Sequence, residues 1–197
     1  MLNQLEFKLM NNPIRGFVQR HYEIKTFLDN EKLEGKRVLE IGCGNGYGSY
    51  LINKYFQPNE IIGIDLDPKF ISLAKKNYPQ FNFQVGDAAK LNFPNNHFDA
   101  IFDFDAMCHI PNWQDALKEI YRVLKNKGRV FIEDFSVESY DTLAGRLTRL
   151  FTVHPYDQMF HRSEFFNFFD KLGFKVIKKE IRNPLGLMEY FVLIASK

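Results

Sequence analysis

A glycine-rich turn after a short apolar segment is the first place where the residue types suggest binding chemistry. The segment 38–41 runs into three alternating glycines, Gly42, Gly44 and Gly46. Glycines let the backbone turn sharply and lie close to a ligand, and the helix expected next would offer its first N–H groups to polar ligand atoms. Glu40 places a carboxylate two residues before the first glycine. A carboxylate there suits a cationic ligand and would repel a pyrophosphate.

The same turn departs from the dinucleotide-binding pattern Gly-x-Gly-x-x-Gly. If the pattern starts at Gly42, its last glycine falls on Tyr47. If it starts at Gly44, the position that requires Gly or Ala is Ser49. The turn therefore disfavours an NAD(P)-dependent oxidoreductase, which stays a minor alternative.

Acidic residues follow three further apolar runs. Asp65 comes about 20 residues after the turn, the spacing at which a carboxylate meets ribose hydroxyls. Asp67 precedes Pro68 and is better interpreted as a helix cap. Asp87 follows the third run after a glycine, and Asp103 closes the fourth, at the edge where open α/β sheets bind ligands.

The elements that would position these residues alternate along the chain. Apolar runs bounded by turn residues predict strands at 37–41, 60–64, 81–85, 99–104 and 129–133. Helical spacing predicts helices at 14–28, 47–56, from 68 onward, 113–124, 139–151 and 163–172, the last capped by Ser163 and stopped by Gly173. Segments 174–181 and 187–195 are two more strands, and their short connection allows only an antiparallel pair. We therefore predict an α/β fold, a Rossmann-like three-layer sandwich whose seven-stranded, mostly parallel sheet ends in an antiparallel C-terminal hairpin.

Length and composition limit the function classes. The 197 residues suit one domain, residues 1–197. The net charge of +2 gives no sign of a nucleic-acid partner, and no apolar run approaches the roughly 20 residues of a membrane span. Cys43 and Cys108 lack the spacing of a zinc site, so no metal is expected. The N-terminus lacks a signal-peptide core, which favours a cytoplasmic protein. The 21 Phe residues would thicken the core, or line an aromatic substrate pocket.

The order of these features between residues 38 and 110 resembles the class I S-adenosylmethionine-dependent methyltransferases. The resemblance implies that S-adenosylmethionine is the cofactor and S-adenosylhomocysteine its product. It also implies that Asp65 accepts from both ribose hydroxyls, that Asp87 accepts from the adenine amino group, and that Asp103 faces the methionine portion. Phe104 would shield the sulfonium or simply pack. The implied cofactor-binding residues are Glu40, Gly42, Cys43, Gly44, Gly46, Asp65, Leu66, Asp87, Ala88, Asp103 and Phe104.

The implied reaction is transfer of a methyl group to a small-molecule acceptor by in-line displacement. Positioning the reactants and excluding water supply most of the catalysis, and a base is needed only for a hydroxyl or carbon acceptor. Asp105 and His109 are the candidates for that base. In the family, a variable segment such as 136–162 covers the acceptor and an N-terminal helix, here within 1–30, closes over the cofactor. Candidate acceptor residues are Arg146, Arg149, His154, Tyr156 and His161, together with Arg162.

Two interpretations of these features stay open. The arginines of segment 136–162 either receive an acidic group of the acceptor or form a solvated helix face. A protein that binds the cofactor without chemistry, as a regulatory or scaffold protein, is the alternative to an enzyme.

Overall fold

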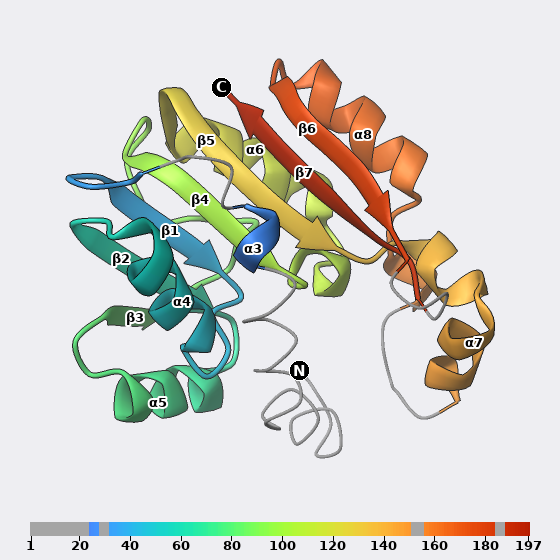
Figure 1. The fold of residues 1–197 in the computed structure, drawn as a ribbon, viewed down its shortest axis with the longest axis horizontal. Helices are drawn as coiled ribbons and strands as arrows, with labels where there is room; N and C mark the ends of the chain where they lie inside the picture. The colour runs from blue at the N-terminus through green and yellow to red at the C-terminus, as the bar shows by residue number, and fades with distance from the viewer. Residues whose placement is uncertain (1–23, 28–31, 151–155, 184–187) are drawn as a thin grey trace.

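A seven-stranded sheet forms the centre of the molecule, with strand order β3-β2-β1-β4-β5-β7-β6 (Figure 1). The computed structural model describes residues 24–27, 32–150, 156–183 and 188–197. The strands are β1 (Arg37–Ile41), β2 (Glu60–Asp65), β3 (Asn82–Val85), β4 (Phe98–Phe104), β5 (Leu124–Asp134), β6 (Lys175–Arg182) and β7 (Tyr190–Ser196). The first five run parallel, and β7 pairs antiparallel with both β5 and β6. The predicted sheet is confirmed, including its antiparallel end.

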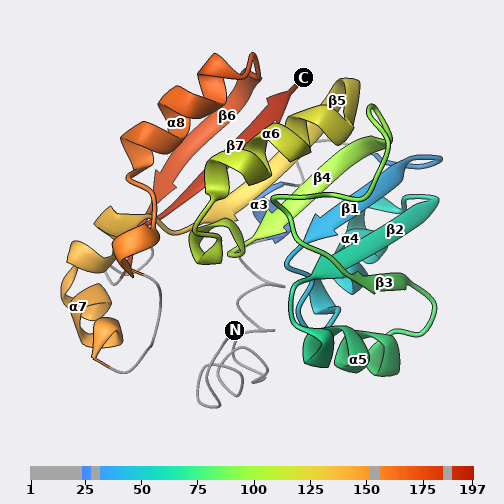
Figure 2. The same cartoon turned by 180° about the vertical axis from the view of Figure 1, so that it is seen from behind.

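Helices cover both faces of this sheet. Figures 1 and 2 show α4 on one face and α6 and α8 on the other. The α-helices are α3 (Ile24–Thr26), α4 (Tyr47–Phe56), α5 (Pro68–Asn77), α6 (Trp113–Val123), α7 (Leu143–Arg149) and α8 (Arg162–Lys171). Short 3-10 turns are η2 (Met107–His109), η3 (Val137–Asp141) and η4 (Tyr156–Gln158). No helix in the described ranges is long and apolar enough to cross a membrane.

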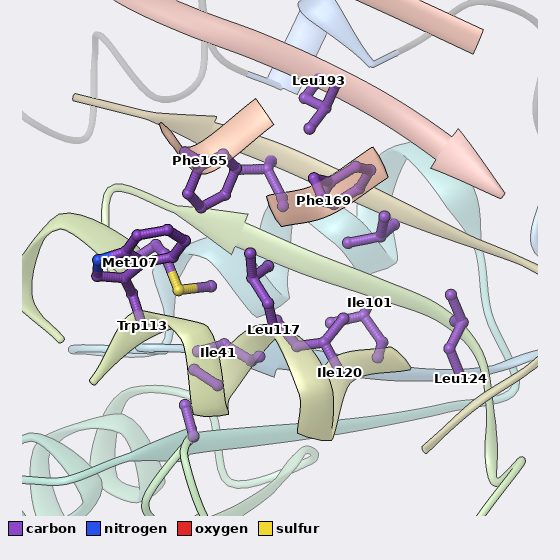
Figure 3. Packing of buried hydrophobic residues seen from close by; sticks show 14 of the residues in the cluster. Ile41, Ile101, Met107, Trp113, Leu117, Ile120, Leu124, Phe165, Phe169 and Leu193 are labelled. Atoms are coloured by element: carbon purple, nitrogen blue, oxygen red, sulfur yellow. The ribbon is translucent and has the colours of Figure 1, made fainter. Parts of the chain in front are cut away.

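Phenylalanine fills much of the core on both faces. Between α6 and α8, the Trp113 and Phe165 rings pack with centroids 5.6 Å apart (Figure 3). The Phe160 ring lies 5.5 Å from the same Trp113 ring. On the other face, Phe102 stacks on Phe131 at 4.5 Å. Each fully buried Phe contributes about 1.5–3 kcal/mol of transfer free energy. Core packing, the first of the two roles considered for the Phe surplus, is therefore what these rings do.

The structure corrects the predicted start of α8. We expected Ser163 to cap this helix, but the helix begins at Arg162 and no side chain of its own caps it. The Glu138 carboxylate instead accepts the Arg162 N–H at 3.2 Å. A residue 24 positions earlier in the chain therefore satisfies the helix N-terminus, which no local pattern could predict.

The segments around residues 139 and 129 also differ from the prediction. The helix expected at 139–151 is split into η3 and α7, because Thr142 accepts the Gly145 N–H and so starts a new helix. Strand β5 starts at Leu124, directly after α6, with a register shift against β4 between Phe98 and Ala100. Of the expected helix 14–28, only residues 24–27 lie in the described ranges.

Candidate functional site

The candidate site lies at the carboxyl ends of the parallel strands, where the strand order reverses between β1 and β4. Chain segments that leave neighbouring strands in opposite directions open a crevice at such a point. The turn after β1 approaches the loop after β4 closely, because a Cβ on Gly42 would lie 2.3 Å from the Ala106 Cβ. These two loops therefore form one continuous wall of the site.

The glycine turn needs its glycines for two reasons. Gly42, Gly44 and Gly46 have φ angles of 65°, 51° and 86°, in the left-handed region that side chains disfavour. Around Gly46 a Cβ would also meet the Phe83 and Tyr78 rings at 2.9 Å. A Cβ on Gly44 would meet nothing within 4 Å. Gly44 therefore leaves an open space beside the turn, which fits a ligand that approaches the backbone.

Asp65 closes β2 at the edge of this space. Its Oδ2 accepts the Gly44 N–H at 3.0 Å and its Oδ1 accepts the Asp67 N–H at 2.9 Å. Partial burial raises the pKa of Asp65, and the two N–H donors act in the opposite direction. Each oxygen keeps a second lone pair, which suits a vicinal diol such as a ribose. Leu66 beside it is 64% exposed, an apolar surface that a bound ring could cover.

Asp67 is the helix cap that its sequence context predicts. Its Oδ1 accepts the Lys69 N–H at 2.9 Å at the start of α5. This confirms the interpretation of Asp67 as a helix cap.

Glu40 is buried beneath the turn and accepts a hydrogen bond from the Ser49 hydroxyl of α4. Burial raises the pKa of Glu40 to about 8, and the Asp65 charge adds to this while the Ser49 hydrogen bond opposes it. The carboxyl is therefore largely neutral at pH 7, and a cation bound nearby would favour its ionised form. Ser49 was not expected at this site.

Cys43 contributes backbone, not its side chain, to the turn. The side chain packs with Ile71, Ala74 and Phe83 under α5. Its N–H donates to the Ile64 carbonyl at 2.9 Å, and its own carbonyl accepts from Gly46. Burial raises the pKa of the thiol well above its usual range, so the thiol stays protonated.

Asp87 and Ala88 lie in the turn after β3. Asp87 is exposed, and its Oδ1 accepts the Ala89 N–H at 2.9 Å. Ala88 is buried against the core on the α6 side of the sheet. The turn is thus held in one conformation, with an acidic side chain at the surface on the same sheet edge as Asp65.

Two buried carboxyl groups hold the loop that follows β4. Asp103 accepts the Ala106 N–H at 3.0 Å, and Asp134, at the end of β5, accepts the Cys108 N–H at 3.0 Å. The Asp103 Oδ2 is buried and has no hydrogen-bond partner in the described part of the chain. Burial and the neighbouring Asp134 charge raise the pKa of Asp103 well above its usual range. Burial and the Asp105 charge raise the pKa of Asp134 to about 7.

Sequence reasoning missed Asp134, although a signal for it exists. Like Asp65, it is an acid that ends an apolar strand. Its strand lies beside β4 with Phe104 in register with Glu133, so the two strand ends meet.

Asp105 and His109 lie on the loop that these carboxyl groups hold. Asp105 has a left-handed φ of 60° and donates its N–H to the Glu133 carbonyl at 2.8 Å. His109 ends η2, and both side chains are half-buried. Strain of this kind, in a residue that is not glycine, is common at functional sites.

The Phe104 side chain is buried and packs against Phe27, with ring centroids 5.7 Å apart.

A group of aromatic side chains lies on the segment after β5. The Tyr140 ring meets the Tyr156 ring at 4.9 Å, and the Arg149 guanidinium lies 5.0 Å from the Tyr156 centroid. Burial raises the pKa of the Tyr140 hydroxyl, and the charges of Asp105 and Asp134 add to the effect. Tyr140 therefore brings this segment to the end of β4, a role that sequence reasoning did not predict.

The other predicted acceptor residues are placed differently. Arg162 pairs with Glu189 at 2.9 Å, and His161 lies 3.3 Å from Glu138. Arg146 is exposed on α7, and His154 lies outside the described residues. The structure thus brings Arg149 and Tyr156 together and gives Arg162 and His161 partners of their own.

The residues present fit the cofactor that the motifs imply. Gly44 leaves open space for a ligand. The Asp65 carboxylate is oriented to accept from a diol. The buried Glu40 carboxyl would be ionised by a cation bound nearby. S-adenosylmethionine carries a ribose diol, an ammonium and a sulfonium. The group of Glu40, Gly44 and Asp65 is called the cofactor cradle below.

Comparisons with known proteins find methyltransferases. Residues 39–132 match the family model of a methyltransferase domain. A phthiotriol/phenolphthiotriol dimycocerosates methyltransferase from Mycobacterium leprae is 31% identical over 132 residues, 66% of this chain and 48% of that protein. A fatty-acid O-methyltransferase from Mycolicibacterium smegmatis is 36% identical over 104 residues, 52% of this chain and 38% of that protein. The chain spans less than half the length of these relatives.

The fold agrees as well. A structure of an S-adenosylmethionine-dependent methyltransferase from Mesorhizobium loti superposes with a TM-score of 0.72 at 16% identity, covering 88% of this chain and 95% of that one. The methyltransferase domain model thus matches the part of the chain that carries the motifs resembling the class I S-adenosylmethionine-dependent methyltransferases.

Proposed function

We propose that this chain binds S-adenosylmethionine in the cofactor cradle and transfers its methyl group to a small, apolar, lipid-like acceptor by in-line displacement. The observation that carries the proposal is the Asp65 carboxylate, which two backbone N–H groups orient at the edge of the space left open by Gly44. When bound, the cofactor supplies an activated methyl group on a cationic sulfur. The protein therefore needs mainly to align the reactants.

The aromatic group after β5 supports an apolar acceptor. The Phe135 ring centroid lies 6.3 Å from the ring centroids of both Tyr140 and Tyr190. The Tyr156 ring contacts Tyr140 and so belongs to the same group. Aromatic rings bury much apolar area and leave hydroxyls to orient a polar end. The two relatives compared above are named for lipid acceptors, which is consistent with this class.

The acceptor's polar end would lie toward Asp105 and His109. A carboxylate acceptor needs no base, whereas a hydroxyl acceptor must lose its proton to one of these side chains during transfer. Arg149, held over Tyr156, is the residue best placed to attract an acidic acceptor group.

Binding and turnover test this function separately. Isothermal titration should show binding of S-adenosylmethionine and S-adenosylhomocysteine, with NADH as the negative control. Formation of S-adenosylhomocysteine is then measured with octanoic acid and with 1-octanol as acceptors. Binding without turnover on either class would support a non-catalytic cofactor-binding protein, and binding of NADH alone would refute the cofactor assignment.

A further inference from the structure

One side of α7 exposes leucines beside an arginine. Leu147 is 53% exposed, and Leu150, directly after the helix, is 74% exposed. Arg146 is exposed as well. At 3.6 residues per turn, these three side chains fall within about 100° of one another. Together they are called the outer face of α7.

The opposite side of the helix is fixed to the protein. A Cβ on Gly145 would lie 2.5 Å from the Ser139 carbonyl oxygen and from the Tyr140 Cα, so α7 is in close contact with η3. Arg149 lies on this side too, over the Tyr156 ring at 5.0 Å. The helix therefore cannot turn its leucines inward without breaking these contacts, and the outer face is held toward solvent.

The position of α7 relates the outer face to the candidate site. Figures 1 and 2 both show α7 beyond the end of the sheet toward which β4 and β5 point. Its inner side contacts Tyr140, because the Arg149 guanidinium lies 5.9 Å from the centroid of the Tyr140 ring. The α7 helix thus lies between Tyr140 and an occupant of the outer face.

We propose that the outer face of α7 docks on a bilayer that contains anionic lipids. The outer face carries Arg146, and the seven residues of α7 include no acidic residue, which complements anionic headgroups. Exposed leucines can enter the interfacial region while arginine reaches back to the headgroups. A stable protein interface buries about 1,200 Å² or more, which two leucines and one arginine do not provide. The proposal rests on the proposed function only for why docking is useful, since the acceptor would come from that bilayer.

Vesicle flotation tests the docking without any methyl transfer. The full chain is floated with vesicles of phosphatidylcholine alone and of phosphatidylcholine with one quarter phosphatidylglycerol. We expect binding to the mixed vesicles, and a loss of about tenfold or more in the Leu147→Ser/Leu150→Ser variant. The matched control is Val176→Ser/Ile177→Ser, which removes two exposed apolar side chains from the edge strand β6 and should bind like the wild type. Arg146→Glu should weaken the preference for the anionic vesicles.

The outcomes separate docking from catalysis. Absence of wild-type binding to either vesicle, or equal binding by the Leu147→Ser/Leu150→Ser variant, overturns the docking proposal. A dimer in sedimentation velocity that this variant abolishes also overturns it, in favour of contact between two copies. S-adenosylmethionine binding by the same variant should equal that of the wild type, which excludes misfolding. Turnover of octanoic acid in buffer tests the proposed function, and its failure would leave the vesicle result unchanged.

Discussion

Asp65 offers the most direct residue-scale test of the cofactor cradle. In Asp65→Asn, one amide oxygen cannot accept both the Gly44 and Asp67 N–H groups and also serve a ribose. We expect a loss of about 1–3 kcal/mol in S-adenosylmethionine affinity, measured by isothermal titration. Asp99→Asn is the matched control, because Asp99 also accepts a backbone N–H, from Arg37 at 3.0 Å, but lies at the opposite end of β4. Equal affinities in wild type and Asp65→Asn would place the ribose elsewhere.

Glu40 should make cofactor binding depend on pH. Its pKa of about 8 means that the carboxyl is mostly protonated in the free protein below pH 8. A bound cation favours the ionised form, so binding below pH 8 releases a proton and the affinity rises with pH up to about 8. We expect the dissociation constant to fall between pH 6 and pH 8 in the wild type. The fall should be smaller in Glu40→Gln, a comparison that cancels the ligand's own titration. The same slope in both proteins would remove Glu40 from the binding site.

At the scale of elements, the glycines of the turn between β1 and α4 serve both folding and binding. Gly42→Ala and Gly44→Ala place a Cβ at a left-handed φ, as does Gly35→Ala in the turn before β1, and each costs about 1–2 kcal/mol. Only Gly42→Ala also drives a Cβ into Ala106 at 2.3 Å. We expect Gly42→Ala to lower the melting temperature most, and Gly44→Ala to match Gly35→Ala in stability.

Cofactor affinity should distinguish Gly44→Ala from Gly35→Ala, although their stabilities should match. Gly35 and Gly44 both face open space, but only Gly44 lies beside Asp65. Gly44→Ala should therefore weaken S-adenosylmethionine binding about tenfold or more, while Gly35→Ala should bind like the wild type. Titration of the folded proteins measures this. Normal binding by Gly44→Ala would mean that the open space beside the turn is not the ligand's.

Elements whose signals are local could be predicted from the sequence. Asp65 ends a short apolar strand, Asp103 is the second-last residue of another, and Asp67 precedes a helix-starting proline. A few neighbouring residues therefore place each of them. Features that depend on distant contacts could not be predicted. Glu138 caps α8 across 24 positions, and the Tyr140 ring contacts the Tyr156 ring of a later segment. The split of segment 139–151 depends on one threonine, whose capping role competes with helix continuation.

At the scale of the whole molecule, the site is an edge to which several strands bring acidic groups. Glu40 lies on β1, Asp65 on β2, Asp103 on β4 and Asp134 on β5. The parallel arrangement that creates the crevice thus also concentrates negative charge there. Such a concentration favours a cationic ligand and disfavours the empty, fully ionised protein. The free energy of unfolding of the free protein should therefore depend on pH through these acidic groups.

The free protein should lose stability as the pH rises from about 4 to 8. Glu40, Asp103 and Asp134 all have pKa values raised by burial, to about 8 for Glu40 and about 7 for Asp134. An acid with a raised pKa in the folded state gives stability that is complete below its unfolded pKa and is lost as the pH passes through the folded one. Unfolding by urea should show a decrease of about 2 kcal/mol or more between pH 5 and pH 8.

Asp103→Asn should reduce that decrease. The amide oxygen can still accept the Ala106 N–H, and the new N–H₂ can donate to the neighbouring Asp134 carboxylate in place of the buried Oδ2 that has no partner in the described residues. We therefore expect the variant to be more stable than the wild type at pH 8 by about 1 kcal/mol and close to it at pH 5. Asp99→Asn, which changes a carboxylate whose pKa is lowered by the Arg37 N–H and by Lys125, should instead lose stability at pH 8. If the unfolding free energies of both variants differed from the wild type by the same amount at every pH, the buried acids at the strand ends would not set the pH dependence.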